Sequence, residues 1–347
     1  MPPTQHLFQQ PPEPEATTPS PARLIMPHLQ VLFHRRTVNP NRTTLRIGTR
    51  GSTLARWQAG RVQHLLAQKG IASELVIIRT SGDRRSIPKP QPGETGKGLF
   101  TKEIEEALLA GEIDLAVHSL KDLASEIPEG LTLAAFPERE DPRDALVTSG
   151  NWTLENLPRG ATLGTSSLRR KAALLAARED LKIVELRGNV PTRVARVGKD
   201  LDGAVLALAG LKRLGLESKG VPLDPEILPP APGQGALAVE ARCDDRATLA
   251  LLASLDDPAV RTAVEAERAA LRELEGGCRA AIGAYCTQQG SGELVLHVKV
   301  FAPDGSRSLA AQVTVDRRDP RASGRAAARE LIERGARELI RQANREA

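Results

Sequence analysis

The cysteine at position 278 stands after two consecutive glycines, in the stretch Glu275-Gly276-Gly277-Cys278-Arg279. Glycine has no side chain and reaches backbone dihedrals closed to other residues, so two in succession let a loop bend sharply and leave the next side chain accessible. Positive charge from Arg279 and Arg268 would favour the reactive thiolate. We interpret Cys278 as an attachment point, with an inert loop thiol as the alternative.

Arginine residues follow several expected strands, at the ends where open α/β sheets bind ligands. The positions are Arg50, Arg169, Arg170, Arg187 and Arg193. Arginine binds carboxylates through a bidentate fork, and helix N-termini favour anions. The pattern predicts a ligand with many carboxylates or phosphates, and carboxylates are favoured because the sequence has no phosphate-binding G-x-x-x-x-G-K-[ST] loop. For any single arginine, a solvated surface charge or an ion pair is the alternative.

Asp122 is the acid at the end of an apolar strand pattern, beside Lys121. Surrounding arginines would keep its carboxylate ionised and able to stabilise a cation. At ~4 Å and an effective dielectric of ~20, such a pair contributes about 4 kcal/mol, roughly a thousandfold in rate if felt only in the transition state. The alternative for Asp122 is a helix N-cap. We expect His118 and Cys243 to be structural and Cys286 to lie in the core.

Composition argues against several classes of protein. The three cysteines form no CxxC pair and the six histidines are scattered, so no metal site is predicted. Reduced thiols suit the cytoplasm, and no apolar run approaches the ~18 residues that span a bilayer. The net charge is only +5 and eight residues are aromatic, which disfavours nucleic-acid binding. Binding through basic loops is kept as a weaker alternative.

The elements that must position these residues form two similar units. The first reads strand-helix-strand-helix-strand, with strands at 45–49, 75–78 and 113–117, which is the order of a doubly wound α/β domain. The second has strands at 161–164, 183–186 and 203–208. Each unit begins with a strand, Gly-Thr and a hydroxyl residue that caps a helix. We therefore interpret the units as weak copies of each other.

The remainder differs in kind. A strand is expected at 237–240, helices at about 246–254 and 258–274, three strands near 281–287, 294–301 and 308–315, and a helix from about 326 to 343. Successive strands with hairpin-length gaps predict a small antiparallel sheet. The predicted domains are a disordered Pro-rich tail (1–44), domain 1 (45–140 plus about 236–255), domain 2 (141–235) and domain 3 (256–347). A start at Met26 is an alternative for the tail, and we expect a mobile loop at 81–98.

The sequence resembles the porphobilinogen deaminase (hydroxymethylbilane synthase) family over about residues 45–343. Nine motifs in one order carry the resemblance: Leu45–Arg50, Gly96–Phe100, His118–Asp122, Glu140–Asp144, Gly164–Arg170, Leu186–Val190, Ala209–Leu216, Pro232–Ala236 and Glu275–Cys278.

The resemblance implies a fold, a reaction and a cofactor. The fold has two doubly wound α/β domains resembling type II periplasmic binding proteins, plus a C-terminal α+β domain with a small antiparallel sheet. The reaction joins four porphobilinogen molecules head to tail, with loss of ammonia, to give hydroxymethylbilane. A dipyrromethane cofactor is tethered through a thioether to Cys278. The enzyme is expected to be a cytoplasmic monomer without nucleic-acid or membrane partners.

The resemblance also assigns roles to individual residues. Asp122 stabilises the cationic, azafulvene-like intermediates. The residues implied in cofactor binding are Ser119, Lys121, Asp122, Thr165, Ser167, Arg169, Arg170, Arg187 and Gly188. Those implied in substrate binding are Arg50, Ser52, Lys97, Phe100, Arg187 and Arg193.

The sequence departs from the family pattern at Pro191, at Ala124-Ser125, in the 84–95 loop and in the extra tail. None of these removes a matched functional residue. The alternative from another class is a non-catalytic, two-lobed protein that binds polycarboxylates.

Overall fold

The computed structural model describes residues 44–81, 101–150, 152–274, 280–290 and 292–345. The predictions for the tail, for most of the 81–98 loop and for Lys97, Phe100 and Cys278 lie outside these residues. Residues 41–347 form one compact unit. The predicted domain boundaries within it stay a prediction.

The first sheet has five strands in the order β2-β1-β3-β10-β4. Strands β1, β2 and β3 are parallel, and β10 runs antiparallel to β3 and β4. The parallel strands therefore share one carboxyl edge. Their bounds are β1 (Thr44–Thr49), β2 (Ala72–Ile77), β3 (Leu115–Ser119), β10 (Leu237–Arg242) and β4 (Leu131–Ala135).

The second sheet repeats this arrangement in the order β7-β6-β8-β5-β9. Strands β6, β7 and β8 are parallel, and β5 is antiparallel to both of its neighbours. In each sheet the antiparallel fourth strand is added after the chain has crossed from the other lobe. The predicted repetition is confirmed. Its strands are β7 (Lys182–Val184), β6 (Thr162–Gly164), β8 (Gly203–Ala207), β5 (Asp144–Thr148) and β9 (Gly220–Pro222).

Alternating apolar side chains explain why helices cover both faces of each sheet. Leu115 and Val117 pack with α1 (Thr53–Gln68) and α6 (Arg246–Ala253), whereas Ala116 packs with α2 (Lys102–Leu109). In the second lobe, α3 covers one face and α5 the other. The helices there are α3 (Leu168–Ala177), α4 (Val190–Val194), α5 (Leu208–Arg213) and the short η3 (Glu217–Lys219).

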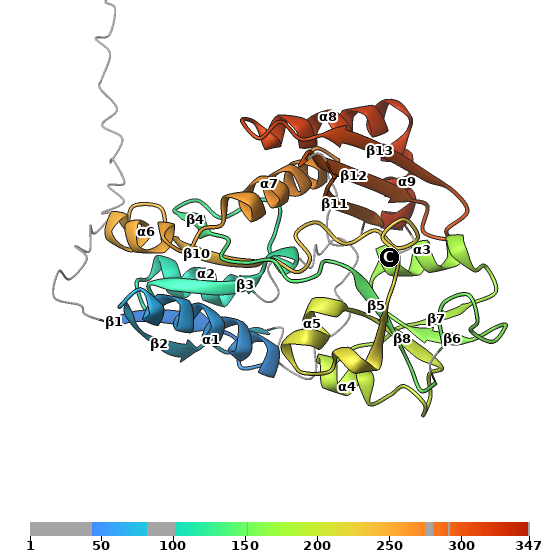
Figure 1. Ribbon diagram of the computed structural model, residues 1–347, viewed down its shortest axis with the longest axis horizontal. Coiled ribbons are helices and arrows are strands. Elements are labelled where there is room, and N and C mark those ends of the chain that lie inside the picture. Colours follow the sequence, from blue (N-terminus) through green and yellow to red (C-terminus); the bar gives the residue numbers. More distant parts are fainter. Residues whose placement is uncertain (1–43, 82–100, 151, 275–279, 291, 346–347) are drawn as a thin grey trace, which may run out of the picture. The chain divides into compact units, whose positions relative to one another are not determined.

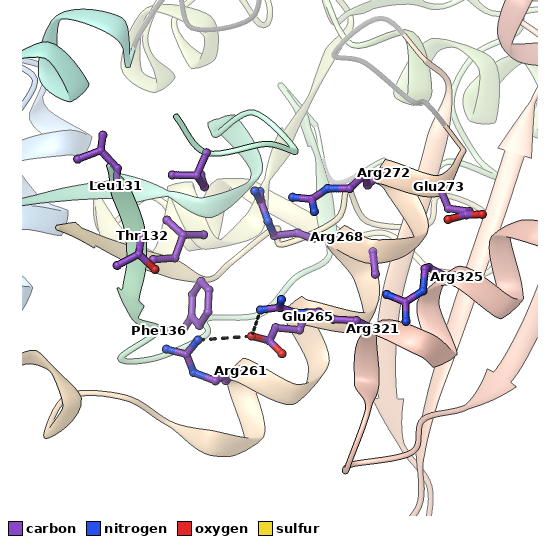
Figure 2. Close-up of a pocket in the computed structure, with 13 residues that line it drawn as sticks. Leu131, Thr132, Phe136, Arg261, Glu265, Arg268, Arg272, Glu273, Arg321 and Arg325 are labelled. Atoms are coloured by element: carbon purple, nitrogen blue, oxygen red, sulfur yellow. Dashed lines mark hydrogen bonds and ion pairs between the residues drawn. The ribbon is translucent and has the colours of Figure 1, made fainter. Parts of the chain in front are cut away.

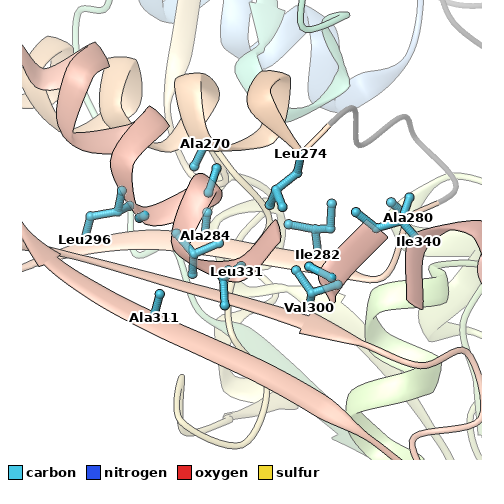
Figure 3. Packing of buried hydrophobic residues seen from close by; sticks show 14 of the residues in the cluster. Ala270, Leu274, Ala280, Ile282, Ala284, Leu296, Val300, Ala311, Leu331 and Ile340 are labelled. Carbon is cyan, nitrogen blue, oxygen red and sulfur yellow. The ribbon is translucent and has the colours of Figure 1, made fainter. Parts of the chain in front are cut away.

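The third region is an antiparallel sheet of β11 (Ile282–Gln288), β12 (Leu294–Phe301) and β13 (Ser308–Thr314), as predicted. Its neighbouring helices are α7 (Pro258–Glu273), α8 (Pro320–Glu333) and α9 (Ala336–Arg345). Figure 3 shows side chains of α7, α8 and α9 meeting those of the strands in one buried cluster. Cys286 packs against this cluster.

The single helix predicted at 326–343 is wrong in its bounds. The chain forms two helices, because Gly335 takes a φ of +96°. That left-handed conformation favours glycine and ends a helix. The first of the two begins earlier than predicted, at Pro320, where the Asp319 side chain accepts a hydrogen bond from the amide of Ala322.

A buried carboxylate connects the third region to the two lobes. Glu267 of α7 accepts two hydrogen bonds from Arg139, at 2.7 and 3.1 Å. It also accepts one each from the backbone amides of Gly233 and Cys286, both at 2.8 Å. Gly233 and Arg139 lie in the two segments by which the chain crosses between the lobes, so α7 is fixed to the crossing itself.

Candidate active site

Cationic side chains from both lobes line one small cavity of about 90 Å³. Ser119 and Lys121 reach it from the end of β3. On the other side it is lined by Arg170 of α3, Arg193 of α4 and Arg213 of α5. No acidic residue is among the described residues that line this cavity. The cavity therefore favours a negatively charged ligand, as the strand-end arginines predict.

Arg169 and Arg170 are both buried against a carboxylate that the sequence interpretation missed. Arg169 Nη1 donates to Asp144 Oδ2 at 2.8 Å, and Arg170 Nη2 donates to Asp144 Oδ1 at 2.7 Å. The Asp144 side chain has no exposed surface. Burial alone would raise the pKa of Asp144, but the two guanidinium groups outweigh it and hold that pKa well below its ordinary value. Arg169 and Arg170 thus use many of their N–H groups in hydrogen bonds within the protein.

Gln234 links this buried group to the first lobe. Its side-chain oxygen accepts from Lys121 Nζ at 3.1 Å, while its amide nitrogen donates to Asp144 Oδ1 at 2.9 Å and to the carbonyl of Pro142 at 2.7 Å. Burial, followed by the nearby charge of Arg170, lowers the pKa of Lys121 from 10.5 to about 8. Lys121 is therefore an ammonium group whose charge is sensitive to pH near neutrality.

Asp122 lies at the last position of the short 3₁₀ helix η2 (Leu120–Asp122) and is exposed. The N-cap alternative is wrong, because the residue at the N-cap position of η2 is Ser119. The negative charge of Asp122 raises the pKa of Lys121 and of Arg193, against the larger effect of burial on each. The carboxylate thus lies within electrostatic reach of two cations that line the cavity.

His118 points away from this chemistry. Its Nε2 lies 3.1 Å from Oε2 of Glu240, and both side chains are buried. Glu240 belongs to β10, beside β3 in the first sheet. This buried contact supports the structural role predicted for His118. Cys243 has an exposed side chain just after β10, and its backbone amide donates to Gly130.

The predicted hydroxyl residues mainly support helix starts. Ser52 accepts from the amide of Ala55 at the start of α1, as predicted for an N-cap. Ser167 accepts from the amide of Arg170 at the start of α3, and buried Thr165 accepts from the amide of Ser167. Ser119 differs, since its hydroxyl accepts from Gln58 at 2.6 Å within the cavity lining.

The turn after β7 depends on glycine. Gly188 has a φ of +112°, and an added Cβ would lie 3.0 Å from Cγ2 of Thr192. Its carbonyl accepts from Arg193 Nε at 2.7 Å. Pro191 lies in the first turn of α4, where proline is tolerated. Proline at position 191, where the sequence departs from the family pattern, therefore leaves the helix that carries Arg193 in regular geometry.

Besides Arg169, two predicted arginines do not line the cavity. Arg187 is exposed and donates through Nε to Oε1 of Glu185 at 2.7 Å. Arg50 is half-buried directly after β1. Both follow carboxyl ends of parallel strands, so their location at the predicted sheet edges is confirmed while their ligand contacts stay a prediction.

Three residues of the site were not assigned a role from the sequence: Asp144, Gln234 and Arg213. All three lie inside motifs that carry the family resemblance. Arg213 donates to the carbonyl of Gly235 at 2.7 Å, and burial lowers its pKa. A signal exists at Gln234, an amide residue between two glycines, whereas Asp144 and Arg213 have no such neighbours.

Comparison with known proteins decides the family. Residues 45–250 match "Porphobilinogen deaminase, dipyromethane cofactor binding domain", and residues 261–333 match "Porphobilinogen deaminase, C-terminal domain". The chain belongs to the porphobilinogen deaminase family. The porphobilinogen deaminase of Moorella thermoacetica is 48% identical over 303 residues, covering 86% of this chain and 96% of the relative. That of Roseiflexus castenholzii is 47% identical and covers 86% and 99%.

Membership of the porphobilinogen deaminase family makes the protein a transferase of porphyrin biosynthesis with a dipyrromethane cofactor. The non-catalytic alternative is not favoured. Among solved structures, the methionine-binding protein MetQ is similar with a TM-score of 0.41 at 16% identity, covering 61% of this chain and 89% of that one. A likeness of this size adds nothing to the assignment.

The structure adds two findings about other classes of protein. Within the described part of the chain, every helix is too short or too polar to cross a membrane. The same residues contain no group of three or more His, Cys, Asp or Glu side chains arranged to hold a metal ion.

Proposed function

We propose that the cationic cavity between the lobes is where this enzyme joins four porphobilinogen molecules head to tail into hydroxymethylbilane. The single observation that supports this placement is the convergence of Lys121, Arg170, Arg193 and Arg213 on one cavity beside Asp122. Every pyrrole unit of substrate and cofactor carries two carboxylates. A site that binds several units must therefore supply several positive charges.

The charges of the residues present fit a dipyrromethane group, while the cavity of about 90 Å³ holds only part of one. Its four carboxylates would meet Lys121, Arg193 and Arg213, whose charges are unbalanced by any acidic residue in the described lining. The hydroxyl of Ser119 and the backbone around Gly188 would contribute further hydrogen bonds. When bound, the cofactor supplies the pyrrole to which the first substrate is joined.

Lys121 is held in place through Gln234. Gln234 accepts one of its three N–H groups, and Gln234 is in turn fixed by Asp144 and by the carbonyl of Pro142. The other two N–H groups of the ammonium can point into the cavity. We assign Lys121 to binding and orienting a carboxylate next to the reacting carbon.

Asp122 is the residue we assign to the transition state. Loss of ammonia from the aminomethyl group of porphobilinogen leaves a cationic pyrrole, and an ionised carboxylate nearby stabilises that cation. The new carbon–carbon bond then forms with loss of one proton from the pyrrole that is attacked. Exposure of Asp122 at the end of β3 leaves its carboxylate accessible to the substrate.

Asp122→Asn tests this role. The variant keeps the shape of the side chain and removes its charge, so we expect kcat to fall about a thousandfold while the protein stays folded. Single-turnover release of ammonia and circular dichroism measure the two effects. Glu129→Gln, at an exposed position outside the cavity, is the matched control. Wild-type turnover in Asp122→Asn would refute the assignment.

Attachment of the cofactor to Cys278 is also a proposal, because residue 278 lies outside the described residues. Intact-mass spectrometry of freshly purified protein tests it. We expect the mass of one dipyrromethane group in excess of the chain, located on the peptide that contains Cys278 and lost in Cys278→Ser. An unmodified Cys278 in active protein would contradict the proposal.

We further propose that the enzyme is a cytoplasmic monomer that binds neither nucleic acid nor membranes. The support is compositional: few aromatic residues, a small net charge and sparse cysteines. Arg50, Ser52, Lys97 and Arg187 are proposed to bind carboxylates of the growing chain, and Phe100 is proposed to contact the substrate. Arg169, held inside by Asp144, is proposed to act on the ligand through the position of its neighbours.

A further inference from the structure

A second cavity, of about 280 Å³, lies between β4 and the helices α7 and α8. It shares no lining residue with the cationic cavity of the active site. Figure 2 shows its two walls: arginine and glutamate side chains reach in from α7 and α8, and Leu131, Thr132 and Phe136 stand opposite. The proposed function does not use this cavity.

The charged wall follows from the spacing of residues on two helices. On α7, positions 261, 265, 268 and 272 fall on one face, because residues three or four apart are neighbours on a helix surface. They are Arg261, Glu265, Arg268 and Arg272. On α8, Arg321 and Arg325 are likewise four residues apart. The lining thus holds five arginines and, with Glu273, two glutamates.

Only some of these arginines have a carboxylate partner. Glu265 lies 2.9 Å from Arg321 and 3.5 Å from Arg261, and Arg261 also pairs with Asp256. Glu273 is bound to Arg329 at 2.8 Å, outside the lining. The two carboxylates of the cavity are therefore already engaged by other groups.

Arg268 and Arg272 are held by backbone carbonyls instead. Arg268 Nη2 donates to Ala124 at 2.6 Å, and Arg272 Nη2 donates to Ser125 at 2.6 Å. Among the described residues, no carboxylate lies within 4.0 Å of either guanidinium, and Arg325 has only Asp319 at 3.9 Å. A carbonyl fixes one N–H group but leaves the charge and the other donors of a guanidinium unsatisfied.

The electrostatics of Arg268 agree with this geometry. Burial, followed by the like charge of Arg272, lowers the pKa of Arg268 to about 10. A like-charged pair that is held together by the fold is stabilised by an anion between them.

The opposite wall is apolar. It consists of Ile127, Leu131, Leu133 and Phe136, and the guanidinium of Arg261 stacks over the Phe136 ring at 4.7 Å. A small inorganic anion would bind to the arginines but would make no contact with the apolar wall. A flat ring with carboxylates would use both walls. The volume is close to the lower end, about 300 Å³, of ordinary small-molecule sites, which suits one ring rather than several.

We propose that this cavity is a binding site for a small organic anion with an apolar ring and at least two carboxylates. Arg268 and Arg272 bind one carboxylate and Arg325 binds the other, while Leu131, Leu133 and Phe136 contact the ring. The site is separate from the cleft in which the substrates are joined. A ligand bound there would contact the guanidinium groups of Arg268 and Arg272. The same groups hold the carbonyls of Ala124 and Ser125, which follow Asp122 by two and three residues.

Isothermal titration calorimetry with benzene-1,3-dicarboxylate tests the proposal on the full chain. We expect saturable binding that weakens with added salt and that is about tenfold weaker in both Arg272→Gln and Arg325→Gln. Arg317→Gln is the matched control, because Arg317 is also exposed and donates to a backbone carbonyl, that of Gly292. Equal binding in all three variants, or no saturable binding to the wild type, would overturn the proposal.

The active-site cavity could also attract this probe, and Arg193→Gln separates the two sites. Binding at the proposed site survives that substitution, whereas binding lost in Arg193→Gln and kept in Arg272→Gln would place the probe in the cleft and overturn the proposal. Citrate, which has no ring, and benzoate, which has one carboxylate, complete the series. We expect both to bind more weakly. Citrate binding as tightly as the ring dicarboxylate would overturn the assignment of the apolar wall.

Discussion

Two groups of arginines in this protein are built in opposite ways. In the cleft, Arg169 and Arg170 turn inward to the buried carboxylate of Asp144, and their side chains are only 5% and 8% exposed. On α7, Arg268 and Arg272 hold carbonyls and, within the described residues, no carboxylate. The sequence pattern made the first group look like the ligand site, whereas it gave Arg268 only a role beside Cys278 and gave Arg272 none.

The difference shows what makes an arginine available to a ligand. A position after a strand brings the side chain to the carboxyl edge of the sheet, where ligands bind. A buried carboxylate at that edge can nevertheless form an ion pair with the arginine and make it unavailable to a ligand. Asp144 does this in the second lobe, and it leaves Lys121, Arg193 and Arg213 as the cations with no carboxylate beside them in the cavity lining. Substitutions in the arginine–Asp144 group of the cleft and in the arginine group of α7 should therefore have different, measurable effects.

The largest effect is expected for Asp144→Asn. The substitution leaves two buried guanidinium groups without a counter-charge, and breaking a buried ion pair costs about 3–5 kcal/mol. Urea unfolding should show a corresponding loss in the free energy of unfolding, if the variant folds at all. Asp200→Asn is the control, since Asp200 forms an exposed pair with Arg196. A loss at Asp144 no larger than in that control would mean that the buried pair is not what holds the cleft arginines.

An intermediate effect is expected when the pH is raised through the pKa of Lys121. The ordinary pKa of 10.5 is lowered to about 8 in the folded protein. Between these values the unfolded chain binds more protons than the folded one, so this group makes the protein more stable as pH rises from about 8. Over the same range the ammonium loses the charge that binds carboxylates, so kcat/KM falls.

The profile of kcat/KM against pH checks this prediction, with Lys121→Arg as the comparison. Arginine stays charged across the range, so its profile should lose the decrease near pH 8 that comes from Lys121 and retain any that comes from the amine of the substrate. Identical profiles for the two proteins would show that Lys121 is not the titrating group.

The smallest effect is expected for stability in Arg272→Gln. Arg272 is an exposed residue of α7, and the substitution removes one of two like charges. It also removes the hydrogen bond from Arg272 to the carbonyl of Ser125. These changes oppose each other, so the free energy of unfolding should change by no more than about 0.5 kcal/mol. Thermal unfolding at low and high salt measures it. A loss comparable to that of Asp144→Asn would show that the two groups of arginines are built alike after all.

Much of the fold could be predicted from periodicity. Alternation such as that of Leu115, Ala116 and Val117 marks a strand covered on both faces, and the two lobes repeat the same order. Strands β4, β5 and β9 were not predicted. They are short and antiparallel, and their pairing comes from segments distant in the chain, such as Asp144 opposite Ala207. The break at Gly335 needs its positive φ to be known.

The site was predictable in its location but not in its internal partners. Topology brings residues after strands to the carboxyl edge of their own sheet, and Lys121 and Arg193, which come from different lobes, line one cavity. Whether Arg169 faces the ligand or Asp144 depends on a contact 25 residues away in the sequence. Neither spacing nor composition carries that information. The part of the site around Cys278 stays a prediction.

The two crossings between the lobes pass side by side, since Glu140 and Gly235 share a backbone hydrogen bond at 3.1 Å and Arg139 forms a β-bridge with Ala236. A Cβ on Gly235 would lie 2.2 Å from the carbonyl oxygen of Glu140. Two backbone segments that are hydrogen-bonded side by side bend readily about an axis along their pairing plane but resist being twisted about each other. We therefore expect any separation of the lobes to be a rotation about the paired segments at Gly235 and Ala236 rather than a twist between them.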